Sequence, residues 1–116
     1  MKSVLDFARY REKGTPISMV TGYDTWSARL IEKSTIGAIL VGDSVGNAML
    51  GHDTTLPVTV DEIASRTGAV ARATDEAVVV ADMPFLSYGT NRQTAIENCG
   101  RMLKEEDADA VKLESG

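Results

Sequence analysis

Short apolar runs alternate with amphipathic segments along this chain. Four runs are apolar over the length of a buried strand, and they begin near residues 17, 38, 77 and 110. The third, Ala77-Val-Val-Val-Ala81, consists of β-branched or small residues, as is typical of strands that are covered on both faces. The pattern therefore predicts strands at 17–21, 38–41, 77–81 and 110–114.

Capping residues and helical periodicity predict the first two helices. Ser3 can cap a helix that ends at Gly14, where a left-handed residue stops the helix. Asp24 occupies the cap position of the next helix. Trp26 and Leu30 are four residues apart, so we expect them to form the apolar face of that second helix.

Two capping boxes predict the helices that follow. Thr59 with Glu62 begins a helix that runs to about residue 73, and Thr90 with Gln93 begins another. The expected buried faces contain Ile63, Thr67, Val70 and Ala71 in the first and Ile96, Cys99 and Leu103 in the second. Residues 43–57, before these helices, are polar and contain glycine, which predicts a long functional loop.

Apolar strands that alternate with amphipathic helices indicate an α/β fold with a parallel sheet, because each crossover helix must return over a face of that sheet. The strand spacing fits a (β/α)8 TIM barrel, in which about 250 residues make eight such units. The chain would then supply roughly the first four units and an N-terminal helix. A small doubly wound sheet is the alternative, but neither G-x-G-x-x-G nor G-x-x-x-x-G-K-[ST] is present.

Composition narrows the class of protein further. The 116 residues are 43% hydrophobic and 25% charged, which is enough for one globular domain. A net charge of -5 argues against a nucleic-acid partner. No apolar run approaches the roughly 18 residues that cross a bilayer, and the charged N-terminal segment lacks the apolar region of a secretory signal. With a single cysteine, these features predict a cytoplasmic protein with no membrane partner.

Acidic residues accompany the ends of all four predicted strands. Asp24, Asp43, Asp82 and Glu114 lie at a strand end or just beyond one. Because parallel strands end at one edge of a sheet, we expect these carboxylates to converge there. Mg2+ prefers such oxygen ligands and relieves their mutual repulsion. Lys112 lies on the same side of its strand as Glu114, so an ammonium group also points at this cluster. The pattern predicts a magnesium site that accepts an anionic chelating substrate.

Each candidate also has a purely structural interpretation. Asp24 is explained more simply as a helix cap than as a ligand, and the next two aspartates could equally be loop or cap residues. Lys112 could simply bridge a neighbouring acid. His52 fits an exposed loop position, and Cys99 fits core packing better than nucleophilic catalysis. No C-x-x-C, H-E-x-x-H or G-x-S-x-G motif is present, so thiolate metal sites and serine esterase chemistry have no support.

Five segments, taken in order, resemble one enzyme family. They are MVTGYD at 19–24, ILVGDSVG at 39–46, TLPVT at 55–59, VADMPF at 80–85 and AVKLE at 110–114. Together they resemble ketopantoate (3-methyl-2-oxobutanoate) hydroxymethyltransferase, over nearly the whole chain. The resemblance implies a (β/α)8 barrel of the phosphoenolpyruvate mutase and isocitrate lyase type, with residues 1–116 as the N-terminal half of a single barrel domain.

The resemblance also implies a site and a reaction. Asp43 and Asp82 would be magnesium ligands, and Glu114 would be associated with the metal. The residues that would hold the substrate are Asp43, Ser44, Asp82 and Lys112. The substrates would be a small 2-oxo acid, 3-methyl-2-oxobutanoate, and 5,10-methylenetetrahydrofolate. Hydroxymethyl transfer through an enolate would give 2-dehydropantoate for pantothenate synthesis, and the enzyme would be a homo-oligomer.

The sequence departs from the family pattern in several places. The family's catalytic base is a glutamate expected beyond Gly116, so no residue of this chain takes that role and we expect the isolated chain to be inactive. Arg66 replaces a usual histidine, residues 115–116 replace a Gly-Gly pair, and Asp107 replaces a glycine in a turn where aspartate tolerates a left-handed backbone. The alternatives are another 2-oxo-acid carbon–carbon lyase or mutase of the same superfamily, and a non-catalytic half-barrel.

Overall fold

The computed structural model describes residues 2–114 and contains one parallel sheet with the strand order β1-β2-β3-β4. The strands are β1 (Met19–Thr21), β2 (Ala38–Val41), β3 (Val78–Asp82) and β4 (Ala110–Lys112). All four predicted strands are present, but three of them have different bounds. β1 begins two residues later than expected, β3 begins and ends one residue later, and β4 ends two residues earlier. The first and last strands form the two edges of the sheet.

The helices are α1 (Val4–Lys13), α2 (Thr25–Glu32), α3 (Val45–Ala48), α4 (Val60–Arg72) and α5 (Arg92–Lys104). Three predicted caps are confirmed. Ser3 and Thr59 form capping boxes at the start of α1 and α4, and Asp24 accepts the backbone N–H of Ser27 at the start of α2. Gly14 ends α1 with a left-handed φ of 69°. Among residues 2–114, no helix is both long and apolar enough to span a bilayer.

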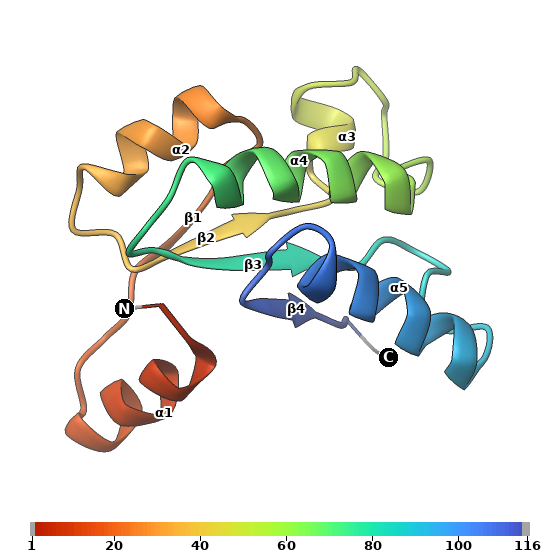
Figure 1. Ribbon diagram of the computed structural model, residues 1–116. Helices are drawn as coiled ribbons and strands as arrows, with labels where there is room; N and C mark the ends of the chain where they lie inside the picture. The colour runs from red at the N-terminus through yellow and green to blue at the C-terminus, as the bar shows by residue number, and fades with distance from the viewer. Residues whose placement is uncertain (1, 115–116) are drawn as a thin grey trace.

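The sheet is covered differently on its two faces. In Figure 1, α2 and α4 lie over one face, α5 packs beside β4, and α1 lies on the opposite side. The first face buries two apolar clusters, one around Ile39 and Val79 and one around Ile63 and Met102. On the other face, Phe7 of α1 packs against a buried cluster of β2 and β3 residues. Apolar burial on both faces explains why the strands read as continuously hydrophobic.

The predicted apolar face of α2 is wrong, and that of α5 is wrong for two of its three residues. Trp26 and Leu30 are 74% and 53% exposed, while Ala28 is fully buried and packs with the cluster around Ile39. Likewise, Ile96 and Leu103 of α5 are exposed, whereas Met102 is buried and Cys99 is partly buried. The small side chain of Ala28 lets α2 approach the sheet closely, with Ile31 packed beside it, while Trp26 and Leu30 lie on the outer side.

Two further expectations need correction. Helix α5 is capped by Asn91, which accepts the backbone N–H of Thr94, and not by a Thr90–Gln93 box. Asparagine is a stronger N-cap than threonine, so α5 begins one residue later than a cap at Thr90 would imply. The segment 43–57 is not entirely loop, because α3 lies within it and buries Val45 and Gly46.

Glu32 at the end of α2 fastens this helix to the segment that leads into β3. Its carboxylate accepts the backbone N–H groups of Asp75, Glu76 and Ala77. Burial alone would raise the pKa of Glu32, but these three hydrogen bonds outweigh it and lower the pKa. A carboxylate with a lowered folded-state pKa contributes stability above its ordinary pKa, and this stability is lost as the pH falls through the folded value.

Glu32→Gln is therefore expected to lower the free energy of unfolding by about 1 kcal/mol at neutral pH. The difference from the unaltered protein should shrink as the pH falls below the ordinary pKa of glutamate, because the unaltered side chain then becomes neutral as well. Urea unfolding at several pH values measures this. Glu12→Gln on the exposed surface of α1 is the control, and a loss that does not vary with pH would contradict the assigned role.

Candidate active site

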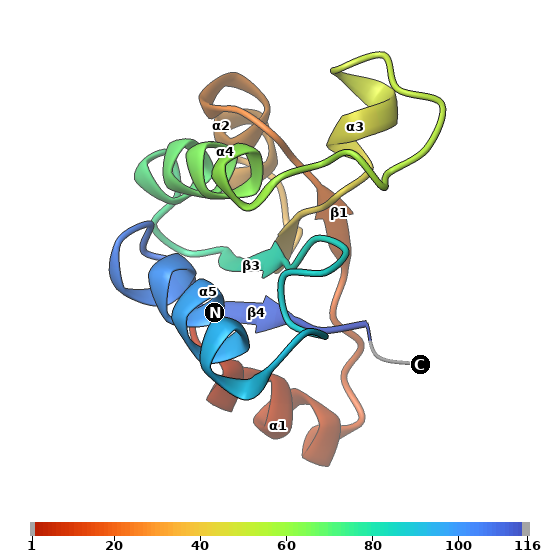
Figure 2. The same ribbon diagram turned by 90° about the vertical axis from the view of Figure 1, so that its right-hand side faces the viewer.

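Three of the four acids predicted at the strand ends gather at the carboxyl edge of the sheet. The backbone N–H of Asp43 donates to Asp82 Oδ2 at 3.1 Å. Lys112 Nζ lies 3.8 Å from Asp82 Oδ1 and 2.5 Å from Glu114 Oε1. Asp43, Asp82 and Glu114 therefore converge with Lys112 as predicted, whereas Asp24 does not join them. Figure 2 views the sheet from this end, where the segments that follow β2, β3 and β4 emerge.

The register of the sheet explains why Asp82 and Lys112 meet. Asp82 is the last residue of β3 and pairs with Lys112, the last residue of β4. Side chains alternate along a strand, so Asp82 shares a face with Val78 and Val80, on the side that α1 covers at its other end. A charged residue therefore continues an apolar row at the point where the strand reaches the edge of the sheet.

Asp82 is the most buried charge of this cluster, with only 5% of its surface exposed. Burial raises the pKa of its carboxyl, and the charges of Asp43 and Glu114 raise it further, against the opposing effects of the Asp43 N–H and the Lys112 ammonium. The hydrogen bond to Glu114 raises the pKa of Lys112, which therefore stays charged. A buried anion among other acids requires a cation, and Lys112 pairs with both Asp82 and Glu114.

A cavity of about 170 Å³ opens beside these groups. Its lining combines the carboxylates with aromatic, aliphatic and hydroxyl side chains: Asp43, Thr55, Leu56, Asp82, Met83, Phe85, Tyr88 and Glu114. Charged groups beside apolar ones suit a small anion with a hydrocarbon end. Tyr88 also donates its hydroxyl proton to the backbone carbonyl of Glu114, which fixes the segment after β4.

Ser44 takes part in a contact that the sequence did not predict. Its Oγ lies 2.6 Å from the hydroxyl oxygen of Tyr23, in the loop after β1. Ser44 precedes α3 directly but makes no side-chain cap bond to that helix. Tyr23 lies just past a strand, as the acids of the cluster do, but it carries no charge, so the expectation that carboxylates converge did not include it.

Residues 2–116 match the family model described as ketopantoate hydroxymethyltransferase. The chain belongs to this family. A 3-methyl-2-oxobutanoate hydroxymethyltransferase of Halobacterium salinarum is 66% identical over 105 residues, which are 90% of this chain and 38% of the relative. One from Geobacter sulfurreducens is 50% identical over 115 residues, which are 99% of this chain and 43% of the relative. The chain thus spans about two fifths of the length of these relatives.

A solved structure supports the fold of this ketopantoate hydroxymethyltransferase family member. The phosphoenolpyruvate phosphomutase of Streptomyces platensis subsp. rosaceus superimposes with a TM-score of 0.75 at 20% identity, covering 94% of this chain and 37% of that one. That protein is a TIM barrel, and the four strands described above correspond to part of it. The predicted barrel class is confirmed.

The donor set at the edge of the sheet fits magnesium, the metal that the resemblance to ketopantoate hydroxymethyltransferase implies. Among residues 2–114, no group of three or more His, Cys, Asp or Glu side chains could hold a metal ion. Magnesium commonly takes one or two carboxylates and completes its shell with water and substrate oxygens. Asp43 and Asp82 match this smaller set, whereas Glu114 is ion-paired with Lys112. The ligand roles of all three remain predictions.

Other candidates lie outside the cluster of Asp43, Asp82, Lys112 and Glu114. Asp24 caps α2, accepting from the N–H of Ser27 at 2.7 Å and from its hydroxyl at 2.8 Å, as its structural interpretation predicted. His52 is exposed, and burial raises the pKa of Cys99, which disfavours a thiolate there. Arg66 donates from Nη1 to the backbone carbonyl of Tyr23 at 3.4 Å.

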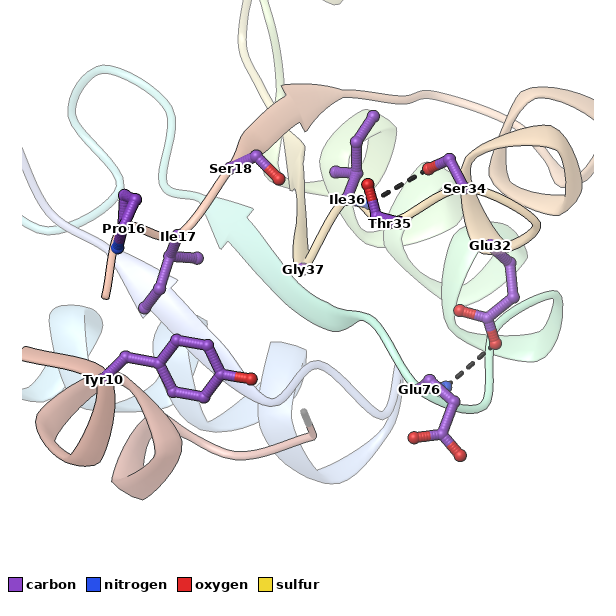
Figure 3. Close-up of a pocket in the computed structure, with 10 residues that line it drawn as sticks. All are labelled: Tyr10, Pro16, Ile17, Ser18, Glu32, Ser34, Thr35, Ile36, Gly37 and Glu76. Atoms are coloured by element: carbon purple, nitrogen blue, oxygen red, sulfur yellow. Dashed lines mark hydrogen bonds between the residues drawn. The ribbon is translucent and has the colours of Figure 1, made fainter. Parts of the chain in front are cut away.

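A second cavity, of about 230 Å³, lies at the amino ends of the strands (Figure 3). It is lined by residues that precede β1, β2 and β3, together with Tyr10 of α1. The carboxylate of Glu32 at its border already accepts backbone N–H groups. Because ligands of parallel α/β folds bind at the opposite ends of the strands, the carboxyl-edge cavity is the better candidate for chemistry.

Proposed function

We propose that this chain forms the oxo-acid-binding and magnesium-binding part of an enzyme that makes 2-dehydropantoate from 3-methyl-2-oxobutanoate and 5,10-methylenetetrahydrofolate. The observation that carries the proposal is the buried Asp82 carboxylate, held between the backbone of Asp43 and the ammonium of Lys112 beside a small cavity. Membership of the ketopantoate hydroxymethyltransferase family supports the choice of reaction.

Each residue of the cluster has a role in this proposal. Asp43 and Asp82 would hold magnesium, and the substrate would bind with its carboxylate near Lys112 and Ser44. A bound magnesium ion supplies Lewis-acid polarisation of the keto group, which acidifies the neighbouring C–H bond. Glu114 holds Lys112 in place through their 2.5 Å ion pair, so that the ammonium stays directed at the site. The apolar side chains Leu56, Met83 and Phe85 would face the branched hydrocarbon end of the substrate.

The reaction requires a base that removes the proton from C3 of the oxo acid. C3 would then form a bond to the methylene carbon, whose two bonds to the folate nitrogens break. Water supplies the hydroxyl group, and the proton from C3 and the second proton of water go to the two nitrogens, which leaves tetrahydrofolate. The resemblance places the base beyond residue 116, so we propose that residues 1–116 alone bind the oxo acid without turning it over. The single cysteine and the biosynthetic reaction favour a cytoplasmic enzyme, and the resemblance favours a homo-oligomer.

A full-length enzyme that contains this chain is expected to exchange the C3 proton of 3-methyl-2-oxobutanoate with deuterated water when magnesium is present. It should also form 2-dehydropantoate once 5,10-methylenetetrahydrofolate is added. Proton NMR follows both reactions, and a sample with the metal chelated is the control. Exchange without folate-dependent product would favour a lyase or mutase, and the absence of exchange would contradict the proposal.

A further inference from the structure

The Ser44 hydroxyl has an unusual arrangement among the residues that precede helices. Ser3, Asp24, Thr59 and Asn91 each accept a backbone N–H of the helix that follows them. Ser44 stands before α3 with helical backbone angles, φ -58° and ψ -12°, and makes no such bond. Its hydrogen bond at 2.6 Å is instead to the Tyr23 hydroxyl. The hydroxyl of Ser44 is therefore free from helix capping and oriented by a residue of another loop.

The chemistry of the two hydroxyl groups sets the direction of this hydrogen bond. A phenol is a stronger acid than an aliphatic alcohol, so Tyr23 is the better donor and Ser44 Oγ the better acceptor. When Tyr23 donates, the proton of the Ser44 hydroxyl remains available for a second partner. Ser44 directly follows Asp43, which lines the carboxyl-edge cavity and donates its backbone N–H to Asp82. The carboxylate of the oxo acid, which the proposed function places near Ser44, supplies that second partner.

Tyr23 is itself held firmly in place. Its side chain packs against the buried cluster around Ile63 and Met102, and its carbonyl accepts a hydrogen bond from Arg66. The preceding Gly22 lies so close to β2 that an added Cβ would meet Ile39 Cγ2 at 3.0 Å. A hydroxyl fixed in this way can orient Ser44 before a ligand arrives, which lowers the entropy lost on binding.

We propose that Tyr23 is a positioning residue, which holds the Ser44 hydroxyl so that its proton is directed at the carboxylate of the bound 2-oxo acid. This inference rests on the proposed function and deepens it. Tyr23 contributes to oxo-acid affinity through Ser44, and it has no part in the proton transfer or in folate binding.

The test uses Tyr23→Phe in the full-length enzyme, because phenylalanine keeps the packed ring and removes only the hydroxyl. We expect KM for 3-methyl-2-oxobutanoate to rise by about 3- to 10-fold, the loss that corresponds to one hydrogen bond. The kcat and the KM for 5,10-methylenetetrahydrofolate should stay within about twofold of the unaltered enzyme. Tyr10→Phe, beside the cavity at the other end of the strands, is the matched control and should change none of these values.

A double-mutant cycle separates positioning from general structural support. Ser44→Ala should raise the same KM, and adding Tyr23→Phe to it should cause no further rise, because the hydroxyl that Tyr23 orients is already gone. An unchanged KM in Tyr23→Phe, or additive losses in the double variant, would overturn the role of Tyr23 while leaving the proposed function intact. If the unaltered enzyme shows no binding or turnover of the oxo acid, the proposed function and this inference both fail.

Discussion

Asp82→Asn is expected to abolish magnesium-dependent proton exchange of 3-methyl-2-oxobutanoate in the full-length enzyme, with a fall in rate of roughly 100-fold or more. Asparagine keeps the shape of the side chain and can still accept the backbone N–H of Asp43. It removes the buried negative charge that is proposed to hold the metal. It also leaves Lys112 with Glu114 as its remaining acidic partner in the cluster.

The same substitution should leave the protein at least as stable as before. Only 5% of Asp82 is exposed, and burial raises the pKa of its carboxyl, so its charge is unfavourable in the absence of metal. Urea unfolding without magnesium should therefore give an equal or higher midpoint for the variant. Loss of activity together with unchanged or improved stability is the signature of a residue retained for binding.

An exposed aspartate provides the control for this experiment. Asp61 on α4 pairs with Arg101 at the surface, and 84% of its side chain is exposed. Asp61→Asn also removes one negative charge, and it should leave the exchange rate unchanged. Retention of magnesium-dependent exchange by Asp82→Asn would remove this residue from the proposed metal site.

Local signals in the sequence were sufficient to predict much of the fold. Asp24 and Thr59 act as caps because each bonds to a backbone N–H within three residues, so the information lies in one short segment. The strand β3 has a composition that suits full burial, and all five of its residues are buried. Asp107 adopts a left-handed φ of 58°, a conformation that aspartate tolerates better than most residues.

Features that depend on distant neighbours were not predictable in this way. The outward position of Trp26 follows from which side of α2 meets the sheet, and the small Ala28 on that side carries little weight in a pattern of large apolar residues. The convergence of Asp43, Asp82 and Lys112 is an exception, and it was predictable because parallel strands end at a common edge. The contact between Tyr23 and Ser44 joins two residues that are 21 positions apart in different loops. Neither side chain is charged, so no charge pattern in the sequence indicates that they meet.

Gly46 is packed closely against Val58 and lies in α3, the helix that directly follows Asp43 and Ser44 of the candidate site. It lies in α3, one turn after Asp43 and Ser44, and it is buried against the loop that leads to α4. An added Cβ would approach Val58 Cγ2 to 2.6 Å, which is shorter than real contacts allow. Val58 is itself buried and has a stiff, β-branched side chain, so it cannot move aside easily. A methyl group at this position must therefore displace α3 or the loop.

Gly46→Ala is expected to lower the free energy of unfolding by about 1–3 kcal/mol, as overpacking of a filled core does. It should also weaken oxo-acid binding, because a displaced α3 moves the adjoining Ser44 and Asp43. Gly100→Ala is the matched control: Gly100 lies inside α5 with no atom within 4 Å of an added Cβ, so alanine there should stabilise the protein by about 0.5–1 kcal/mol. Urea unfolding and calorimetric titration of the oxo acid measure both effects. If the two variants shifted stability in the same direction, the close approach of Gly46 to Val58 would not be what requires glycine at this position.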